Sequence, residues 1–293
     1  MKTLFYMTKR NMKMFFKDKG MFFTSLITPI ILLVLFVTFL ARIYKQSLPK
    51  GLPEGIQNGI VNGQLFSSLF AVSCVTVAFC ANMLMVSDKV NGTKKDIYIT
   101  PTKKSTIAMS YYFASLFATL LVALVGTVAC FIYIGATGWF MSFGDVVLIF
   151  IDLFMLSLFG TALSSIINCF LSSQGQISAV GTIVSAGYGF ICGAYMPISQ
   201  MGSVMQNILA FLPGTYGTSL LKYHALSGVF REMSKQGISA DVISGIKDNI
   251  DCNLYFFGNQ VSIGAMYGVM IGSIILLIGA YVLISVLRAK KKK

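Results

Sequence analysis

The sequence predicts an all-α polytopic membrane protein with six transmembrane helices, and three observations support this class. The 293-residue chain is 56% hydrophobic and only 11% charged, whereas a soluble domain carries about a quarter charged residues. Uncharged runs recur that are long enough to cross a bilayer, which takes about 20 apolar residues per helix. Lysines and arginines concentrate at both ends and in alternate loops. The net charge of +13 is therefore a signal of membrane topology and not of nucleic-acid binding.

Six long runs that are almost free of charge define the expected spans. One acid, Asp152, lies inside the fourth run. At a rise of ~1.5 Å per residue each run can cross a hydrocarbon core of about 30 Å. The expected spans are residues 21–41, 60–86, 107–135, 146–171, 177–195 and 262–287.

The distribution of lysine and arginine orients the chain. Residues 2–19 hold six of them, residues 87–105 hold five and residues 288–293 hold five, which makes 16 of the 23. The positive-inside rule places these segments, and hence both termini, in the cytoplasm, and it requires an even number of spans. The expected location is a cell membrane crossed several times, such as the bacterial cytoplasmic membrane.

Residues 1–20 are expected to form an amphipathic helix on the inner leaflet before the first span. At 100° per residue the apolar and basic side chains separate into two adjacent faces, which is typical of an interfacial helix. The apolar face holds Leu4, Phe5, Met12, Phe15 and Phe16, and the basic face holds Lys2, Lys9, Arg10, Lys13 and Lys17.

Residues 196–261 are expected to lie on the outer side. Within them, residues 197–221 predict a re-entrant or interfacial hairpin, because Pro213-Gly214 interrupts an otherwise apolar run. An ordinary seventh helix at residues 203–221 is the alternative. That helix would send the basic C-terminal tail outside, against the charge rule.

The loop between the second and third spans, residues 87–105, contains more than topology-setting lysines. Asn91-Gly92-Thr93 predicts a turn, and Asp96-Ile97-Tyr98-Ile99 forms a short apolar strip among lysines. Thr100-Pro101 ends this element before the third span begins. An ordered apolar strip ringed by cations predicts a docking surface for a soluble partner.

Catalytic and metal-binding motifs are missing from the sequence. It has one histidine, His224, no phosphate-binding G-x-x-x-x-G-K-[ST] motif and no G-x-S-x-G motif. Its six cysteines show no metal-ligand spacing. We therefore expect no enzyme activity, no metal site and no directly bound cofactor. A disulfide between Cys192 and Cys252 stays open but is not expected.

Asp152 and the glycine rows are the remaining features inside the spans. An intramembrane carboxylate is a functional candidate, and we favour a structural or path-lining role for Asp152 over proton coupling. Glycine or serine recurs every four residues on two spans, which allows close helix contacts. These rows are Ser185, Gly189 and Gly193 on the fifth span and Gly264, Gly268 and Gly272 on the last.

Two ordered sets of motifs resemble the ABC-2-type permeases, the membrane subunits of ATP-binding-cassette (ABC) exporters. The first set follows the second span: Asp88-Lys89, Gly92-Thr93, Ile97-Tyr98-Ile99 and Thr100-Pro101. The second set follows the fifth span: Gly193 four residues before Pro197, then Leu212-Pro213-Gly214, and Gly228 as a later small-residue turn. The family usually has glutamate where this chain has Asp88.

The resemblance implies a mechanism and partners. Two permease copies, identical or different, would pair and dock two copies of a separate ATPase subunit, which would bind ATP and Mg. Substrates would be amphiphilic drugs, antimicrobial peptides or lipids. The first span, with Pro29, and the fifth would line the path. The coupling residues would be Asp88, Lys89, Gly92, Thr93, Lys94, Lys95, Ile97, Tyr98, Thr100 and Pro101. The competing class is an ion-coupled secondary transporter that uses Asp152.

Overall fold

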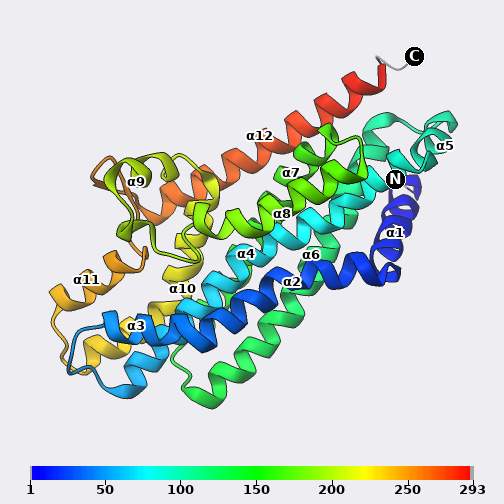
Figure 1. The fold of residues 1–293 in the computed structure, drawn as a ribbon. Helices are drawn as coiled ribbons and strands as arrows, with labels where there is room; N and C mark the ends of the chain where they lie inside the picture. Colours follow the sequence, from blue (N-terminus) through cyan, green and yellow to red (C-terminus); the bar gives the residue numbers. More distant parts are fainter. Residues whose placement is uncertain (1, 291–293) are drawn as a thin grey trace.

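A computed structural model describes residues 2–290 and shows a bundle of long helices with one small β-hairpin (Figure 1). The long helices are α1 (Lys2–Lys17), α2 (Lys19–Leu35), α4 (Glu54–Val90), α6 (Lys104–Thr137), α7 (Phe143–Phe170), α8 (Gln174–Ile191), α10 (Pro213–Lys235) and α12 (Ile263–Lys290). The short elements are a π-helical turn (Phe36–Leu40), α3 (Ala41–Ser47), α5 (Thr93–Ile99), a 3-10 turn (Ile198–Gln200), α9 (Ser203–Leu209), α11 (Ala240–Asn249), β1 (Tyr255–Phe256) and β2 (Asn259–Gln260).

Five helical segments of the described chain are long and apolar enough to cross a membrane. They correspond to the predicted first, second, third, fourth and last spans, which confirms the all-α polytopic class. The first segment joins α2, the π-helical turn and α3 into one continuous helix. The segments are Lys19–Ser47, Glu54–Val90, Lys104–Thr137, Phe143–Phe170 and Ile263–Arg288.

The expected fifth span falls on α8, which has 18 residues and is not among these five segments. It ends at Ile191, four residues before the predicted end, because Gly193 adopts a φ of +71° and turns the chain. A glycine in this left-handed conformation commonly terminates a helix. At ~1.5 Å per residue α8 is about 27 Å long, close to the hydrocarbon thickness. That α8 crosses the membrane therefore remains a prediction.

Helix α4 forms the centre of the bundle and packs against α2, α6, α7, α8 and α10 (Figure 1). The contact with α7 is close, since a Cβ at Gly160 would lie 2.7 Å from the Cys74 carbonyl oxygen. The Asn82 amide on α4 donates to the hydroxyls of Ser164 (2.6 Å) and Ser165 (2.9 Å) on α7. These polar side chains tie two membrane helices together inside the apolar bundle.

The segment between α8 and α12 differs in part from the sequence prediction. No single helix covers residues 203–221: α9 ends at Leu209, the chain turns, and α10 begins at Pro213. Proline fits the first turn of a helix because no hydrogen bond from its nitrogen is needed there. Helix α10 then runs past the predicted end of the hairpin to Lys235 and packs between α4, α7 and α12.

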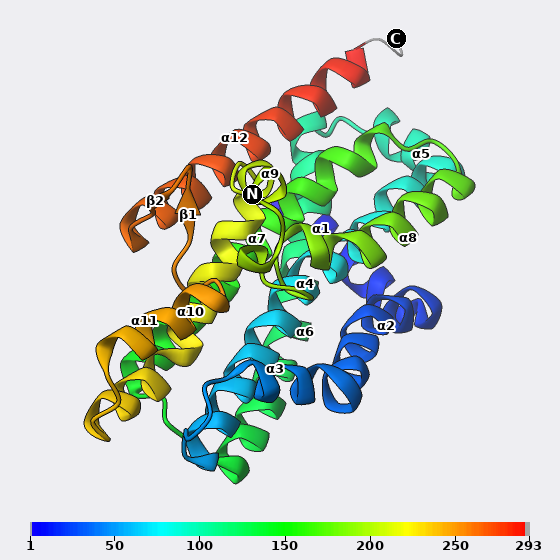
Figure 2. The same ribbon diagram turned by 60° about the vertical axis from the view of Figure 1, so that its left-hand side comes forward.

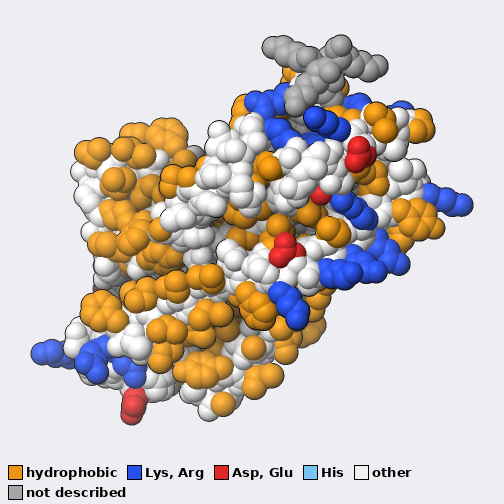
Figure 3. Space-filling model, turned by 45° about the vertical axis from the view of Figure 1, so that its right-hand side comes forward, with side chains coloured by type: hydrophobic (Ala, Val, Ile, Leu, Met, Phe, Trp, Pro, Cys, Tyr) orange, Lys and Arg blue, Asp and Glu red, His pale blue; other side chains and the backbone are white. Residues whose placement is uncertain are grey.

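The two ends of the bundle carry different elements. Helices α1 and α5 and the end of α12 lie at one end (Figure 1), whereas α3, α11 and the β1–β2 hairpin lie toward the other (Figure 2). On the face in Figure 3, Lys and Arg gather near the C-terminal end, and a smaller group lies at the opposite end. The larger group belongs to the end that the sequence assigns to the cytoplasm.

This orientation can be tested with single added cysteines. We expect cysteines at Lys50 and Asn249, both exposed, to react with an impermeant thiol reagent on intact cells, and cysteines at Lys95 and Ser173 to react only after lysis. The wild-type protein sets the baseline because its cysteines are buried or half-buried. Labelling at Ser173 on intact cells would overturn the predicted topology.

Candidate functional site

The loop predicted to contact a soluble partner folds as the short helix α5, between α4 and α6. Gly92 has a φ of +85° and turns the chain out of α4. At the other end the Thr100 hydroxyl donates to the Ile97 carbonyl (2.7 Å), and the Lys104 ammonium donates to the Tyr98 carbonyl (2.7 Å). Pro101 follows outside the helix, as predicted. The element is thus a defined helix at the basic end of the bundle.

Asp88, at the end of α4, is the centre of a polar network that joins three helices. Its carboxylate is 5% exposed and accepts hydrogen bonds from both terminal nitrogens of Arg10 (2.5 and 3.3 Å) and from the Tyr111 hydroxyl (2.7 Å). Arg10 belongs to α1 and Tyr111 to α6. A two-pronged arginine–carboxylate contact fixes orientation as well as distance. The network therefore links α1 to the helices that flank α5.

The predicted amphipathic helix α1 forms, but one cation of its predicted basic face turns toward the protein. Arg10, expected on the basic face, is half-buried, and Thr8 and Asn11 are buried with it. Hydrogen bonding to Asp88 raises the pKa of Arg10 above its ordinary value. Phe5, expected on the apolar face, is 65% exposed, which agrees with a side chain that faces the inner leaflet. The sequence pattern missed the partner Asp88, which attracts Arg10 into the protein.

The apolar strip of α5 divides into two parts. Ile97 and Tyr98 are half-buried and pack against the chain's own core beside Leu84, Met85 and Ile107. Ile99 is 85% exposed. The apolar ends of α4 and α6 cover part of Ile97 and Tyr98, and the rest of both side chains stays accessible. Their contact with a partner stays a prediction. Ile99 is the most exposed apolar side chain of this strip, so a partner would bury most area there.

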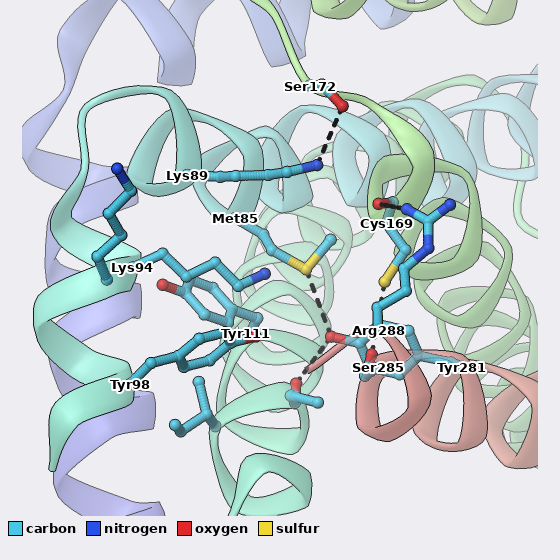
Figure 4. Close-up of a pocket in the computed structure, with 13 residues that line it drawn as sticks. Met85, Lys89, Lys94, Tyr98, Tyr111, Cys169, Ser172, Tyr281, Ser285 and Arg288 are labelled. Carbon is cyan, nitrogen blue, oxygen red and sulfur yellow. Dashed lines mark hydrogen bonds between the residues drawn. The ribbon is translucent and has the colours of Figure 1, made fainter. Parts of the chain in front are cut away.

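The lysines around α5 occupy three different environments. The Lys89 ammonium donates to the Leu171 carbonyl (2.5 Å) and the Ser172 hydroxyl (3.2 Å), which ties the end of α4 to the turn before α8. Lys94 lies beside the ring of Tyr98, 5.7 Å from its centroid, in Figure 4. Lys95 is exposed. Lysines predicted only as a ring of charge therefore also take part in the packing.

The residues singled out on the outer side gather around a buried ion pair. The Lys222 ammonium, on α10, is fully buried, donates to the Gly193 carbonyl (2.8 Å) and lies 3.4 Å from the Asp251 carboxylate. Asp251 also accepts from the amide nitrogens of Ile198 (2.6 Å) and Ser199 (2.9 Å), directly after Pro197. This pair fixes the turn that follows α8.

Pro213 and Gly214 begin α10 and bring it against α8. A Cβ at Gly214 would lie 2.5 Å from the Tyr188 hydroxyl oxygen. Pro213 and Gly214, predicted to interrupt the apolar run, therefore allow close contact between α10 and α8 on the outer side. Gly228, expected in a turn, instead lies in the middle of α10.

Asp152 has partners that the sequence did not reveal. Its carboxylate is 1% exposed, lies 2.6 Å from the His224 Nδ1 atom and accepts from the Tyr267 hydroxyl (2.5 Å). These groups come from α7, α10 and α12. Because Asp152 is enclosed, it lines no surface of the described chain, and its geometry is that of a tie between three helices. The lone histidine was the available signal, but its distance in sequence from Asp152 concealed the pairing.

The remaining predicted features have mixed outcomes. Pro29 lies half-buried inside α2. Gly189 contacts Tyr195 of the same chain, whereas Gly264, Gly268 and Gly272 have open space beside their Cα atoms. Cys192 and Cys252 are both free and buried. In the part of the chain that the structure describes, no group of His, Cys, Asp or Glu is placed to hold a metal ion.

The fold and this site define a class, a helical multi-pass membrane protein with a short basic helix between two of its spans. The sequence model of the ABC-2 type transporter family matches residues 2–224, about three quarters of the chain. The protein belongs to this family and is the permease component of an ABC transporter. The family implies association with an ABC ATPase partner. No curated protein matches the chain.

Proposed function

We propose that this permease belongs to an ATP-driven exporter of amphiphilic substrates, with α5 as the element that receives the motion of the ATPase. The observation that carries the proposal is the Asp88 network, in which Arg10 and Tyr111 join α1 and α6 to α4, directly before α5. A push on α5 would reach α4 through the short Asn91-Gly92 turn, and the network would pass it on to α1 and α6.

The proposed assembly contains two permease copies, identical or different, and two ATPase subunits. The ATPase subunits would bind ATP and Mg, while this chain supplies the path and the coupling surface. The proposed location is the bacterial cytoplasmic membrane, with both termini inside, in keeping with the charge distribution. Amphiphilic drugs, antimicrobial peptides and lipids are the substrate classes that suit a path between apolar helices.

The competing class, an ion-coupled secondary transporter, depends on Asp152. Coupling would require this carboxylate to exchange a proton or ion with an aqueous path. In the structure Asp152 is enclosed, and its two oxygens are occupied by His224 and Tyr267. This geometry favours a structural role, so ATP remains the proposed energy source.

The coupling role of α5 predicts a specific loss of ATPase docking. Replacing the exposed Ile99 with serine should weaken binding of the ATPase subunit about tenfold to a hundredfold, since burial of an isoleucine contributes roughly 1.5–3 kcal/mol and each 1.4 kcal/mol is tenfold in affinity. The measurement is titration of the purified permease with its ABC ATPase subunit.

A matched control separates docking from a general effect of the substitution. Ile208 on α9 is 55% exposed at the opposite end of the bundle, so Ile208→Ser should leave docking unchanged. Substitution of Ile97 or Tyr98 is less informative because both side chains also hold α5 on the bundle. If the Ile99→Ser variant and the wild-type protein bound the ATPase subunit with equal affinity, the proposal that α5 contacts the ATPase would be wrong.

A further inference from the structure

A cavity of about 580 Å³ lies between α5, the ends of α4 and α12, the start of α6 and the turn before α8 (Figure 4). It is separate from the exposed Ile99, because Ile99 does not line it. Figure 4 shows Lys89 along one side, Lys94 and the tyrosines of α5 and α6 on another, and Arg288 opposite them. Its lining includes Lys89, Lys94, Lys95 and Tyr98 of the predicted coupling segment, but the sequence motifs predict no cavity there, and Ile99, which tests the proposed ATPase contact, lies outside it.

The charge of the lining is entirely positive. Four cations from three helices line the cavity, and none of the described lining residues is Asp or Glu. The Arg288 guanidinium donates to the Cys169 carbonyl (2.6 Å) and lies 4.2 Å from the centroid of the Phe170 ring, which holds its charge beside the cavity. The hydroxyls of Ser172 and Ser285 add neutral donors. Cations and hydroxyl donors from several elements are the groups that bind phosphate oxygens.

The rest of the lining is apolar and held in place. Met85, Ile107 and Ala108 are buried side chains beneath the cations. Tyr281 contacts two of these residues, since its hydroxyl donates to the Ala108 carbonyl (2.9 Å) and lies 3.6 Å from the Met85 sulfur. A free phosphate ion would leave this apolar part without contacts. A ligand with a phosphate and an attached apolar portion fits both parts.

The position of the cavity indicates where such a ligand comes from. Lys89 and Arg288 stand at the ends of two membrane helices, on the end that carries most of the basic residues. Basic pockets between helices at the cytoplasmic surface suit anionic lipid head groups. We propose that this cavity binds the phosphate group of an anionic amphiphile, supplied by an anionic phospholipid of the inner leaflet. Such a ligand would contact α5 and α12 together.

The experiment measures binding to the full-length protein in neutral detergent. Thermal unfolding is followed during titration with dioleoyl phosphatidylglycerol, with dioleoyl phosphatidylcholine and with inorganic phosphate, because a ligand that binds the folded state raises the unfolding midpoint. We expect phosphatidylglycerol to raise the midpoint at concentrations where the other two do not. The double variant Lys95→Gln/Arg288→Gln should bind phosphatidylglycerol about tenfold more weakly or worse.

Two control variants make the result specific. Lys9→Gln/Lys13→Gln removes two exposed lysines of α1 that do not line the cavity and should retain wild-type affinity. Lys95→Arg/Arg288→Lys keeps both charges and should retain most of the binding, which excludes loss through misfolding. An equal loss in the α1 variant would mean only general surface attraction. If phosphatidylcholine raised the unfolding midpoint as much as phosphatidylglycerol, the cations would not select the ligand. If inorganic phosphate did so, the ligand would need no apolar portion, and the proposal of an amphiphile would be wrong.

Discussion

Replacing Lys222 with methionine is expected to destabilise the protein by about 3–5 kcal/mol. The Lys222 side chain is fully buried and the Asp251 side chain is 7% exposed, so the change leaves a buried carboxylate without its cation. It also removes the hydrogen bond to the Gly193 carbonyl, which holds the turn after α8. The measurement is the denaturant-induced unfolding of the purified protein in detergent.

A control on the same helix separates burial from charge. Lys235 lies 3.8 Å from Glu232, and its side chain is 76% exposed, so Lys235→Met should cost at most about 1 kcal/mol. The double variant Lys222→Met/Asp251→Asn should recover part of the loss, because it removes both buried charges and asparagine tolerates the positive φ of residue 251. If Lys222→Met and Lys235→Met lowered the free energy of unfolding by similar amounts, the buried ion pair between Lys222 and Asp251 would be contradicted.

The second large effect is expected from Gly228→Ala in the middle of α10. An added Cβ would lie 2.6 Å from the carbonyl carbon of Phe140, in the loop before α7. Because the neighbour is backbone and not a flexible side chain, α10 or the loop must shift. Overpacking of this kind costs typically 1–3 kcal/mol, and we expect about 3 here. The thermal unfolding midpoint of the variant should fall accordingly.

The same substitution in an open place should not destabilise the protein. Gly268 on α12 has no neighbouring atom within 4 Å of an added Cβ. Gly268→Ala should therefore be neutral or stabilising by up to about 1 kcal/mol, since alanine loses less backbone entropy in a helix. Equal destabilisation by both changes would show that α10 does not approach the Phe140 backbone as described.

Hydropathy and charge were sufficient to predict most of the architecture. Membrane helices need long apolar runs, and five of the six expected spans correspond to such helices. The short helix α5 was predictable because the Gly92 turn and Thr100-Pro101 bracket it. The extent of α10 was not predictable from hydropathy, because Lys222, His224 and Arg231 interrupt its apolar character. Their partners Asp251, Asp152 and Asp145 lie on other elements.

The candidate site was predicted in its location and not in its contacts. Local patterns place Asp88 at the end of α4, but they contain no information on Arg10, which lies 78 residues away in sequence. The same limit applies to Ile97 and Tyr98. A short apolar strip is predicted to be fully exposed until the helices that cover part of it are known. Long-range packing decided which side of α5 is left for a partner.

The central position of α4 has a consequence for how the protein is made. Of its main partners, only α2 precedes it in the chain, whereas α6, α7, α8 and α10 emerge later from the ribosome. Until then, amide side chains such as Asn62 and Asn82 face lipid without Thr137 and Ser164, to which they donate in the folded state. Polar groups in hydrocarbon are costly when they lack partners. A chain stalled before α6 lacks both of these partners and is therefore a natural substrate for membrane quality-control proteases.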